Sequence, residues 1–391
     1  MIKLNLDYAK YKMRACDVSR GQDAYKKLLE ASSMTDWMHK SISADELKAI
    51  KLTAKKVRKD CDVFIVCGIG GSFMGAKAVI DALSPYYKKK NDIEILFVGR
   101  DLSGQYLKET MEYIKGKSVY VNIISKSGGT LETTLATNIL LKFMQKSFKD
   151  WKDRVIVTTG SRGALNDLSK ENYLTTFRVP ENIGGRYSVF SAVGLLPIAV
   201  MGFDVDKLLA GAKLKKETIM DAITYGIMRN VLCARGYQVE AITAYERKYI
   251  NLLNWAQQLF GESQGKDKKG VLPFANVFTT NLHSIGQYFQ EGADIVFVTN
   301  IVELNLKNYI REMDDINMLA VDCVSKAFAK GNTPSITISI DKMDETALGE
   351  LMQFMMYASA VGGFALDVNP FDQNGVEEYK KNIKNAMHAN E

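Results

Sequence analysis

Two segments rich in glycine and hydroxyl side chains carry the residue types that hold a phosphate group. Residues 68–72 read Gly-Ile-Gly-Gly-Ser, and residues 125–133 read Ser-Lys-Ser-Gly-Gly-Thr-Leu-Glu-Thr. Each follows a short apolar run and precedes a helical pattern. Glycines let backbone N–H groups approach an anion closely, and the following helix adds unpaired donors and the positive end of its dipole. Together they predict a phosphate site, although either segment alone also fits an ordinary strand-to-helix turn.

The spacing within these segments does not match the common nucleotide-binding motifs. The chain contains no G-x-x-x-x-G-K-[ST] loop, and neither segment has the G-x-G-x-x-G spacing with a suitably placed acid. We therefore expect the phosphate to belong to a small phosphorylated molecule.

One of the three histidines is placed where it could transfer protons. His39 lies in a lysine-flanked stretch and His388 near the end of the chain, whereas His283 opens a helical pattern. Helical spacing puts Gln287 and Glu291 on the same face as His283. A histidine can carry protons near neutral pH. A structural, hydrogen-bonded histidine remains the alternative at this point.

An acid and an arginine also stand in suggestive surroundings. Glu262 follows apolar Leu259 and Phe260 near a helix end, where desolvation would strengthen it as a base. Arg186 follows two glycines, as a fixed guanidinium facing an anion would. An exposed glutamate and a surface arginine are the alternatives.

Composition describes an ordinary globular protein. The chain has 391 residues, long enough for two or three domains, with 47% hydrophobic and 25% charged residues. Its formal charge of +6 mildly favours anionic ligands. The basic runs are short and lie beside acids, so no nucleic-acid partner is expected.

Sequence features point to the cytoplasm. Five cysteines without CxxC spacing suggest neither a disulfide framework nor a zinc site. The first ten residues contain an acid and no uninterrupted apolar region, so no signal peptide is expected. The longest apolar stretch, 189–201, contains Pro197 and is too short to cross a bilayer. No membrane association is expected.

The periodicity predicts an α/β fold with two doubly wound parallel-sheet domains. Short β-branched runs separated by helical patterns are typical of parallel strands with crossover helices. The strands are expected at 63–67, 93–98, 119–124, 155–159, 295–299 and 335–340. Helices are expected around 189–200, 345–364 and 376–389. We divide the chain into a helical lead-in (1–59), two α/β domains (60–180 and 181–368) and a C-terminal turn and helix (369–391). Ligands in such sheets bind beyond the carboxyl ends of the strands, where both glycine segments fall.

Six motifs, in order along the chain, resemble the glucose-6-phosphate isomerase (phosphoglucose isomerase) family in its short prokaryotic form. That family has two sugar-isomerase domains, and six motifs in order are far more specific than one. The matching stretches are GIGGSFMGA at 68–76, SKSGGTLET at 125–133, GGRYSVFSAVGLLP at 184–197, QLFGESQGK at 258–266, HSIGQYFQEG at 283–292 and NPFDQNGVEEYK at 369–380.

The resemblance implies a role for each matching residue. Glu262 would be the base that moves a proton between C2 and C1, and Arg186 would stabilise the enediolate. His283 would open the sugar ring with Lys380 as its partner, a choice over Lys381 that rests on motif register. The implied substrate-binding residues are Gly71, Ser72, Ser125, Lys126, Ser127, Thr130 and Gln373.

The resemblance also implies the reaction and the assembly. The expected activity is reversible isomerisation of glucose 6-phosphate and fructose 6-phosphate, in glycolysis and gluconeogenesis, without a metal or other cofactor. In this family the histidine enters from a neighbouring subunit, so a homodimer with shared sites is expected. Gly129 stands where many relatives are expected to carry a hydroxyl, which would remove one phosphate donor.

Two other functions remain open from the sequence. A sibling isomerase could also accept mannose 6-phosphate, because a phosphate site does not sense the C2 configuration. A non-catalytic sugar-phosphate sensor would keep the phosphate site but would have no reason to keep Glu262, His283 and Lys380 together. Their joint presence favours an enzyme.

Overall fold

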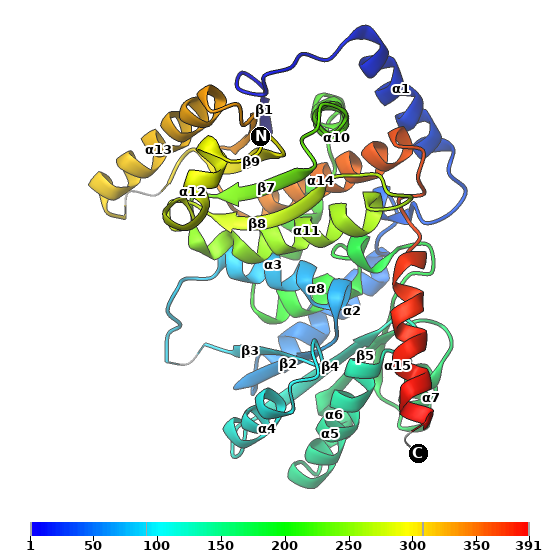
Figure 1. Cartoon of the computed structure of the whole chain (residues 1–391). Helices are drawn as coiled ribbons and strands as arrows, with labels where there is room; N and C mark the ends of the chain where they lie inside the picture. Colours follow the sequence, from blue (N-terminus) through cyan, green and yellow to red (C-terminus); the bar gives the residue numbers. More distant parts are fainter. Residues whose placement is uncertain (1, 91, 307–308, 390–391) are drawn as a thin grey trace.

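The computed structural model describes residues 2–90, 92–306 and 309–389, and within them it contains two five-stranded sheets (Figure 1). One sheet lies in the upper half of the view and the other in the lower half, with helices between them. The helices are α1 (Ala15–Glu30), α2 (Ala44–Val57), α3 (Met74–Leu83), α4 (Gly104–Tyr113), α5 (Leu131–Ser147), α6 (Trp151–Arg154), α7 (Ala164–Glu171), α8 (Ala192–Val200), α9 (Val205–Gly211), α10 (Lys216–Ala234), α11 (Ile250–Gln264), α12 (Leu282–Glu291), α13 (Arg311–Lys330), α14 (Glu345–Ala365) and α15 (Glu377–Ala389).

The lower sheet is entirely parallel, with the strand order β3-β2-β4-β5-β6. Its strands are β2 (Val63–Cys67), β3 (Glu94–Val98), β4 (Val119–Ser125), β5 (Val155–Thr159) and β6 (Thr175–Arg178). The four strands predicted in this region are confirmed to within one residue at each end. Every residue of β2, β4 and β5 is buried, which explains why these strands are continuous apolar or small-polar runs.

The upper sheet has the order β1-β10-β9-β7-β8, and one of its edges differs from the prediction. Its strands are β1 (Ile2–Asn5), β7 (Val239–Ala244), β8 (Leu272–Val277), β9 (Val296–Glu303) and β10 (Ser335–Ile340). The expected helical lead-in contains α1 and α2, but it begins with the short strand β1, which pairs antiparallel with β10 so that Ile2 lies opposite Ile340. The apolar side chain of Ile2 is 4% exposed, and its burial favours this pairing over a helix.

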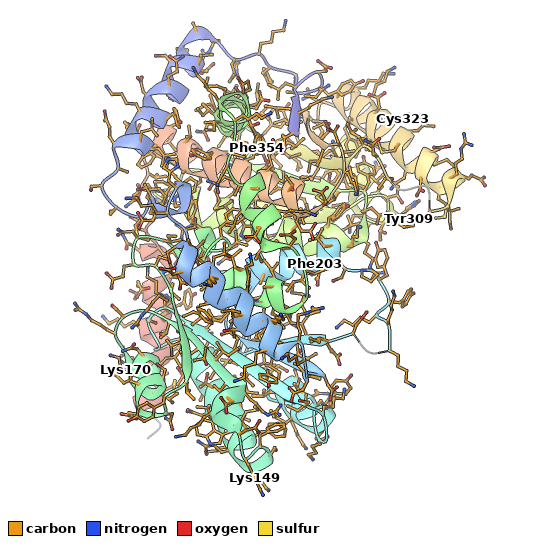
Figure 2. All side chains as sticks on the ribbon, turned by 180° about the vertical axis from the view of Figure 1, so that it is seen from behind. Lys149, Lys170, Phe203, Tyr309, Cys323 and Phe354 are labelled. Atoms are coloured by element: carbon orange, nitrogen blue, oxygen red, sulfur yellow. The ribbon has the colours of Figure 1, made fainter. Side chains whose placement is uncertain are left out.

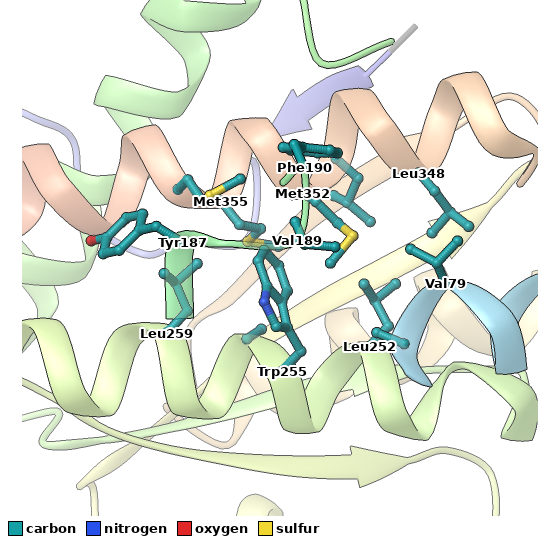
Figure 3. Packing of buried hydrophobic residues seen from close by; sticks show 14 of the residues in the cluster. Val79, Tyr187, Val189, Phe190, Leu252, Trp255, Leu259, Leu348, Met352 and Met355 are labelled. Atoms are coloured by element: carbon teal, nitrogen blue, oxygen red, sulfur yellow. The ribbon is translucent and has the colours of Figure 1, made fainter. Parts of the chain in front are cut away.

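The helices between the two sheets form one continuous hydrophobic core. The core reaches from Phe64 on β2 to Ile301 on β9. Figure 3 shows Trp255 and Leu259 of α11 facing Met352 and Met355 of α14. Figure 2 shows Phe354 within α14, in the body of the molecule, whereas Lys149 and Lys170 lie at the periphery of the lower half. The two halves therefore pack closely, as expected.

The strand order determines where the lower sheet can bind a ligand. Strand β2 lies between β3 and β4, so the chain leaves its carboxyl end toward β3 and later returns to the other side as β4. Ligands of open α/β sheets bind at such a switch point. Both glycine segments begin there, because 68–72 follows β2 and 126–130 follows β4.

Among the described residues, no helix combines the length and the apolar character needed to cross a bilayer.

Candidate active site

The segment after β2 passes directly over the end of β4. It contains the 3₁₀ turn η2 (Gly70–Ser72). A Cβ on Gly68 would lie 2.8 Å from the Ser72 Cβ and 3.0 Å from the Ile124 carbonyl oxygen. Gly70 has a φ of +57°, a conformation that glycine adopts without strain. Glycine at both positions therefore lets this segment lie close to the end of β4.

The segment after β4 is shaped by its own hydroxyls. The Ser125 Oγ accepts a hydrogen bond from the Gly128 N–H at 3.1 Å, and the Ser127 Oγ accepts one from the Gly129 N–H at 3.3 Å. Thr130 immediately precedes α5, and its side chain makes no capping hydrogen bond to that helix. The first turn of α5 thus begins beside a loop rich in hydroxyls and backbone N–H groups, as an anion site requires.

Lys126 connects this loop to the segment that carries Arg186. Its Nζ donates hydrogen bonds to the carbonyl oxygens of Glu181, at 2.8 Å, and Ile183, at 3.0 Å. Partial burial lowers the pKa of Lys126, while the Glu181 carboxylate acts in the opposite direction. Two of the three ammonium protons are therefore used to position the chain just before Arg186.

Gly71 and Gly185 bring the first glycine segment against Arg186. A Cβ on Gly71 would lie 2.1 Å from the Gly185 carbonyl oxygen and 2.8 Å from the Arg186 nitrogen. Only a glycine fits at this contact, so the identity of residue 71 sets how close the two segments can come.

Replacing Gly71 by Ala should therefore destabilise the protein and disturb the site. We expect a loss of about 1–3 kcal/mol in the free energy of unfolding, as for other overpacked positions, together with a displaced Arg186. Urea unfolding followed by circular dichroism measures the first effect. Gly104→Ala is the control, since a Cβ there meets nothing within 4 Å. Equal stability of the two variants would contradict the contact.

Arg186 is buried and is held by three hydrogen bonds from two neighbouring segments. It lies in the 3₁₀ turn η3 (Gly185–Tyr187) and is 3% exposed. Its Nε donates to the Ser263 Oγ at 2.8 Å, and its Nη2 donates to the carbonyl oxygens of Pro370 at 2.6 Å and Asp372 at 3.0 Å. These hydrogen bonds fix the guanidinium plane, and Nη1 is the nitrogen that they do not use.

Glu262 lies beside Arg186 Nη1, in the last turn of α11. Its Oε2 is 3.5 Å from Arg186 Nη1, and its Oε1 accepts a hydrogen bond from Gln258 Nε2 at 3.1 Å. The Glu262 side chain is 30% exposed, so a ligand can reach it. The site thus combines a reachable carboxylate with a fixed positive charge.

The turn at 369–373 covers the other side of Arg186. Besides the two carbonyl contacts to the guanidinium, Asp372 Oδ1 lies 2.7 Å from Lys266 Nζ. Burial lowers the pKa of Lys266, although the hydrogen bond to Asp372 raises it. Gln373 follows directly and is exposed. This turn is therefore anchored to the end of α11 next to Glu262.

Two predicted catalytic residues lie apart from this group. His283 is exposed on α12, and Lys380 is exposed on α15, where its Nζ lies 2.9 Å from Glu377 Oε1. Figure 1 shows α12 and α15 on opposite sides of the molecule. Within one chain, the described contacts bring neither residue to Glu262 or Arg186.

The structure adds three residues to the site that sequence reasoning did not assign. Ser263 contacts Arg186, Gln258 contacts Glu262, and Lys266 contacts Asp372. The spacing of Gln258 and Glu262 by one helical turn was a visible signal for that pair. The other two contacts depend on how separate segments pack.

The sequence of this chain is similar to known proteins over most of its length. The sequence model of "Phosphoglucose isomerase" matches residues 18–322 and 311–390. A "Glucose-6-phosphate isomerase" of Fusobacterium nucleatum is 37% identical over 98% of this chain and 95% of its own length. One of Caldanaerobacter subterraneus subsp. tengcongensis is 41% identical over 86% of this chain and 82% of its own length.

Solved structures share the fold. A hypothetical protein from Thermus thermophilus aligns with a TM-score of 0.86 and 24% identity, covering 99% of this chain and all of that one. A glucose-6-phosphate isomerase from Chlamydia trachomatis aligns with a TM-score of 0.78 and 22% identity, covering 95% of this chain and 78% of that one. With the family match over nearly the whole sequence, these findings show that the chain belongs to the phosphoglucose isomerase family.

Proposed function

We propose that this protein interconverts glucose 6-phosphate and fructose 6-phosphate through an enediolate, with Glu262 as the base. The observation that carries the proposal is the contact between a reachable carboxylate and a fixed guanidinium beside two phosphate-type loops. In the direction from aldose to ketose, Glu262 removes the proton from C2 and returns it to C1, while a proton moves from the C2 hydroxyl to the C1 oxygen. No redox or metal cofactor is needed for these proton transfers.

Arg186 is suited to stabilise the negative charge of the enediolate. Three of its five N–H groups, one on Nε and two on Nη2, are occupied by the protein contacts described above. The two on Nη1 point to the side of Glu262, where one makes only a long 3.5 Å contact. A preorganised positive donor at the position where charge develops needs little rearrangement during the reaction.

The loops at the switch point are suited to hold the phosphate. Ser125, Ser127, Thr130 and the start of α5 supply hydroxyl and N–H donors, and Gly71, which Ser72 follows, packs against Gly185 and Arg186. Binding at the phosphate, remote from C1 and C2, would position the reacting carbons against Glu262. Lys126 would support this geometry through the 181–183 carbonyls.

Removing single hydroxyls from the phosphate loop should weaken binding without removing the chemistry. For Ser127→Ala and for Thr130→Ala we expect a loss of about 1 kcal/mol each in the binding of a phosphorylated sugar acid, roughly fivefold in Kd. Isothermal titration calorimetry measures this change. Thr224→Ala is the control, because that exposed hydroxyl bonds only within α10. Unchanged affinity in both loop variants would refute the assignment.

Ring opening is assigned to His283 and Lys380, with His283 supplied by a second copy of the chain. His283 is exposed on α12, and none of the described contacts joins it to Glu262 of its own chain, which supports this arrangement. The proposal therefore includes a homodimer with two composite sites. Gln373, next to the anchored Asp372, would line the sugar. As an enzyme of sugar-phosphate metabolism, it would act in the cytoplasm.

A coupled assay tests the function. Purified protein is incubated with fructose 6-phosphate, and glucose 6-phosphate is detected by a dehydrogenase that forms NADPH. We expect turnover with glucose 6-phosphate as product, and mannose 6-phosphate offered in parallel tests the broader specificity. No conversion of fructose 6-phosphate by folded protein would refute the proposed function.

A further inference from the structure

Behind the site, the second sheet contains a fully buried ion pair, Arg229 on α10 and Glu240 on β7. Both side chains are 0% exposed, and the Nε and Nη2 of Arg229 each lie 2.7 Å from Glu240 Oε2. The other carboxylate oxygen accepts hydrogen bonds from Tyr225 and Thr299, each at 2.7 Å. Burying two charges costs several kcal/mol per ion, so such a pair is weak evidence for a gain in stability. Its contacts suggest a different purpose.

Arg229 contacts the last turn of α11 at two points. Its guanidinium lies 3.9 Å from the centre of the Phe260 ring, and its Nη1 donates to Gln264 Oε1. Residues 260 and 264 are one turn apart and share a face of the helix. Gln264 is also 0% exposed, and its Nε2 donates to the Ser359 carbonyl at 2.9 Å. The inner face of this turn is therefore fixed by polar contacts in addition to packing.

The residues between these two points belong to the site. Glu262 and Ser263 lie on the part of the same turn that faces Arg186, and Ser263 Oγ is hydrogen-bonded to Arg186 Nε. The last turn of a helix has carbonyls without intrahelical partners and frays unless other groups hold it. A rotation of this turn would move Glu262 and Ser263 together.

We propose that Arg229 is a positioning residue for the isomerase reaction, acting through Gln264 to set the rotation of the last turn of α11. Glu240 keeps the Arg229 guanidinium in place, and Arg229 in turn holds Gln264. The carboxylate of Glu262 and the Ser263–Arg186 hydrogen bond then share one fixed geometry. The proposal rests on the proposed function in treating Glu262 as the base, and it adds no chemical step.

Two conservative variants test the link. Arg229→Lys keeps a positive charge for Glu240 but replaces the separate nitrogens that contact Glu240 and Gln264 with a single one. Gln264→Met keeps the size of the side chain but removes the acceptor. We expect kcat to fall about tenfold in each with KM nearly unchanged, because small misplacements of a catalytic group are costly and the phosphate loops are untouched. The double variant should fall no further than either single variant, since both remove the same link.

Thr243→Val is the matched control. Thr243 lies on the same strand as Glu240, is 0% exposed, and its hydroxyl donates to Asn300 Oδ1 at 2.7 Å. Thr243 is three residues after Glu240. Because side chains alternate between the two faces of a strand, it faces the other side of the sheet, away from α11. Thr243→Val should lower the free energy of unfolding and leave kcat within about twofold.

Amide hydrogen exchange by mass spectrometry provides a readout that does not depend on activity. In Arg229→Lys and Gln264→Met we expect faster exchange at residues 259–265 and 184–187, and in Thr243→Val we expect no change there. The proposal would be overturned if all three variants showed equal exchange. It would also be overturned if Thr243→Val lost as much kcat as the other two variants, or if the losses of kcat added up in the double variant. If the unchanged protein itself shows no turnover, the proposed function fails, while the exchange pattern still decides whether Arg229 holds the turn.

Discussion

Replacing Glu262 by Gln lowers kcat by at least about 10²-fold while KM changes little. The amide keeps the size of the side chain and can still accept from Gln258, but it cannot take the C2 proton, and general-base catalysis is worth roughly 10²–10⁴-fold. Because the phosphate loops and Arg186 are unchanged, substrate binding should persist. Steady-state kinetics with fructose 6-phosphate measure both constants.

The control for this variant is Glu30→Gln, which changes an exposed glutamate at the end of another helix, α1. It should retain full activity, so that loss in Glu262→Gln reports the site and not a general effect of removing a carboxylate. Incorporation of solvent deuterium into the sugar gives a second measurement, since it follows the proton at C1 and C2 directly. Near-normal turnover with Glu262→Gln would remove this residue from the mechanism.

The sequence predicts the buried strands of this fold better than its edges. Strands β2, β4 and β5 lie inside the lower sheet and are buried on both faces, so their apolar runs are unambiguous. The strands that sequence reasoning missed include the edge strands β1, β6 and β8, which have exposed positions, and Pro273 in β8 is a residue that sheets accept mainly at an edge. A short, half-exposed strand carries too weak a pattern to be identified.

Strand β7 was missed for another reason. It lies inside the upper sheet, but it carries Glu240, a charge that argues against a buried strand. Only the fold shows that Arg229, eleven residues earlier on α10, supplies the opposite charge. A partner that becomes visible only in three dimensions cannot be inferred from local pattern.

In the candidate site, too, the sequence identified local features but not contacts between distant segments. The glycine segments could be identified because phosphate loops are local features, and Glu262 and Arg186 because each stands at a recognisable turn or helix end. The contact of Gly71 with Gly185, and that of Ser263 with Arg186, join segments more than 75 residues apart and needed the structure. The role of His283 is still a prediction that rests on an assembly of two chains, and the role of Lys380 is still a prediction that rests on motif register.

Mixing two inactive variants should restore activity if that assembly is correct. A protein lacking His283 and a protein lacking Glu262 should each be nearly inactive as homodimers. In a mixed dimer, one composite site receives both intact groups and the other receives neither, provided the interface is isologous. Random exchange at equal concentrations makes half of the dimers mixed, so about a quarter of all sites become active. His283→Ala and Glu262→Gln are mixed after mild dissociation, and turnover is measured before and after exchange.

A second mixture serves as the control because the structure places Glu262 and Arg186 in contact within one chain. Glu262→Gln mixed with Arg186→Lys should give no recovery, since every site of the mixed dimer then lacks one of the two groups. Native mass spectrometry confirms that exchange has occurred in both mixtures. If exchange is complete and the His283→Ala mixture stays at the activity of its parents, His283 acts within its own chain or takes no part in catalysis. Recovery in the His283→Ala mixture, without recovery in the control mixture, would show that His283 acts at the active site of the second copy. A group that acts within its own chain could not restore activity in only one of the two mixtures.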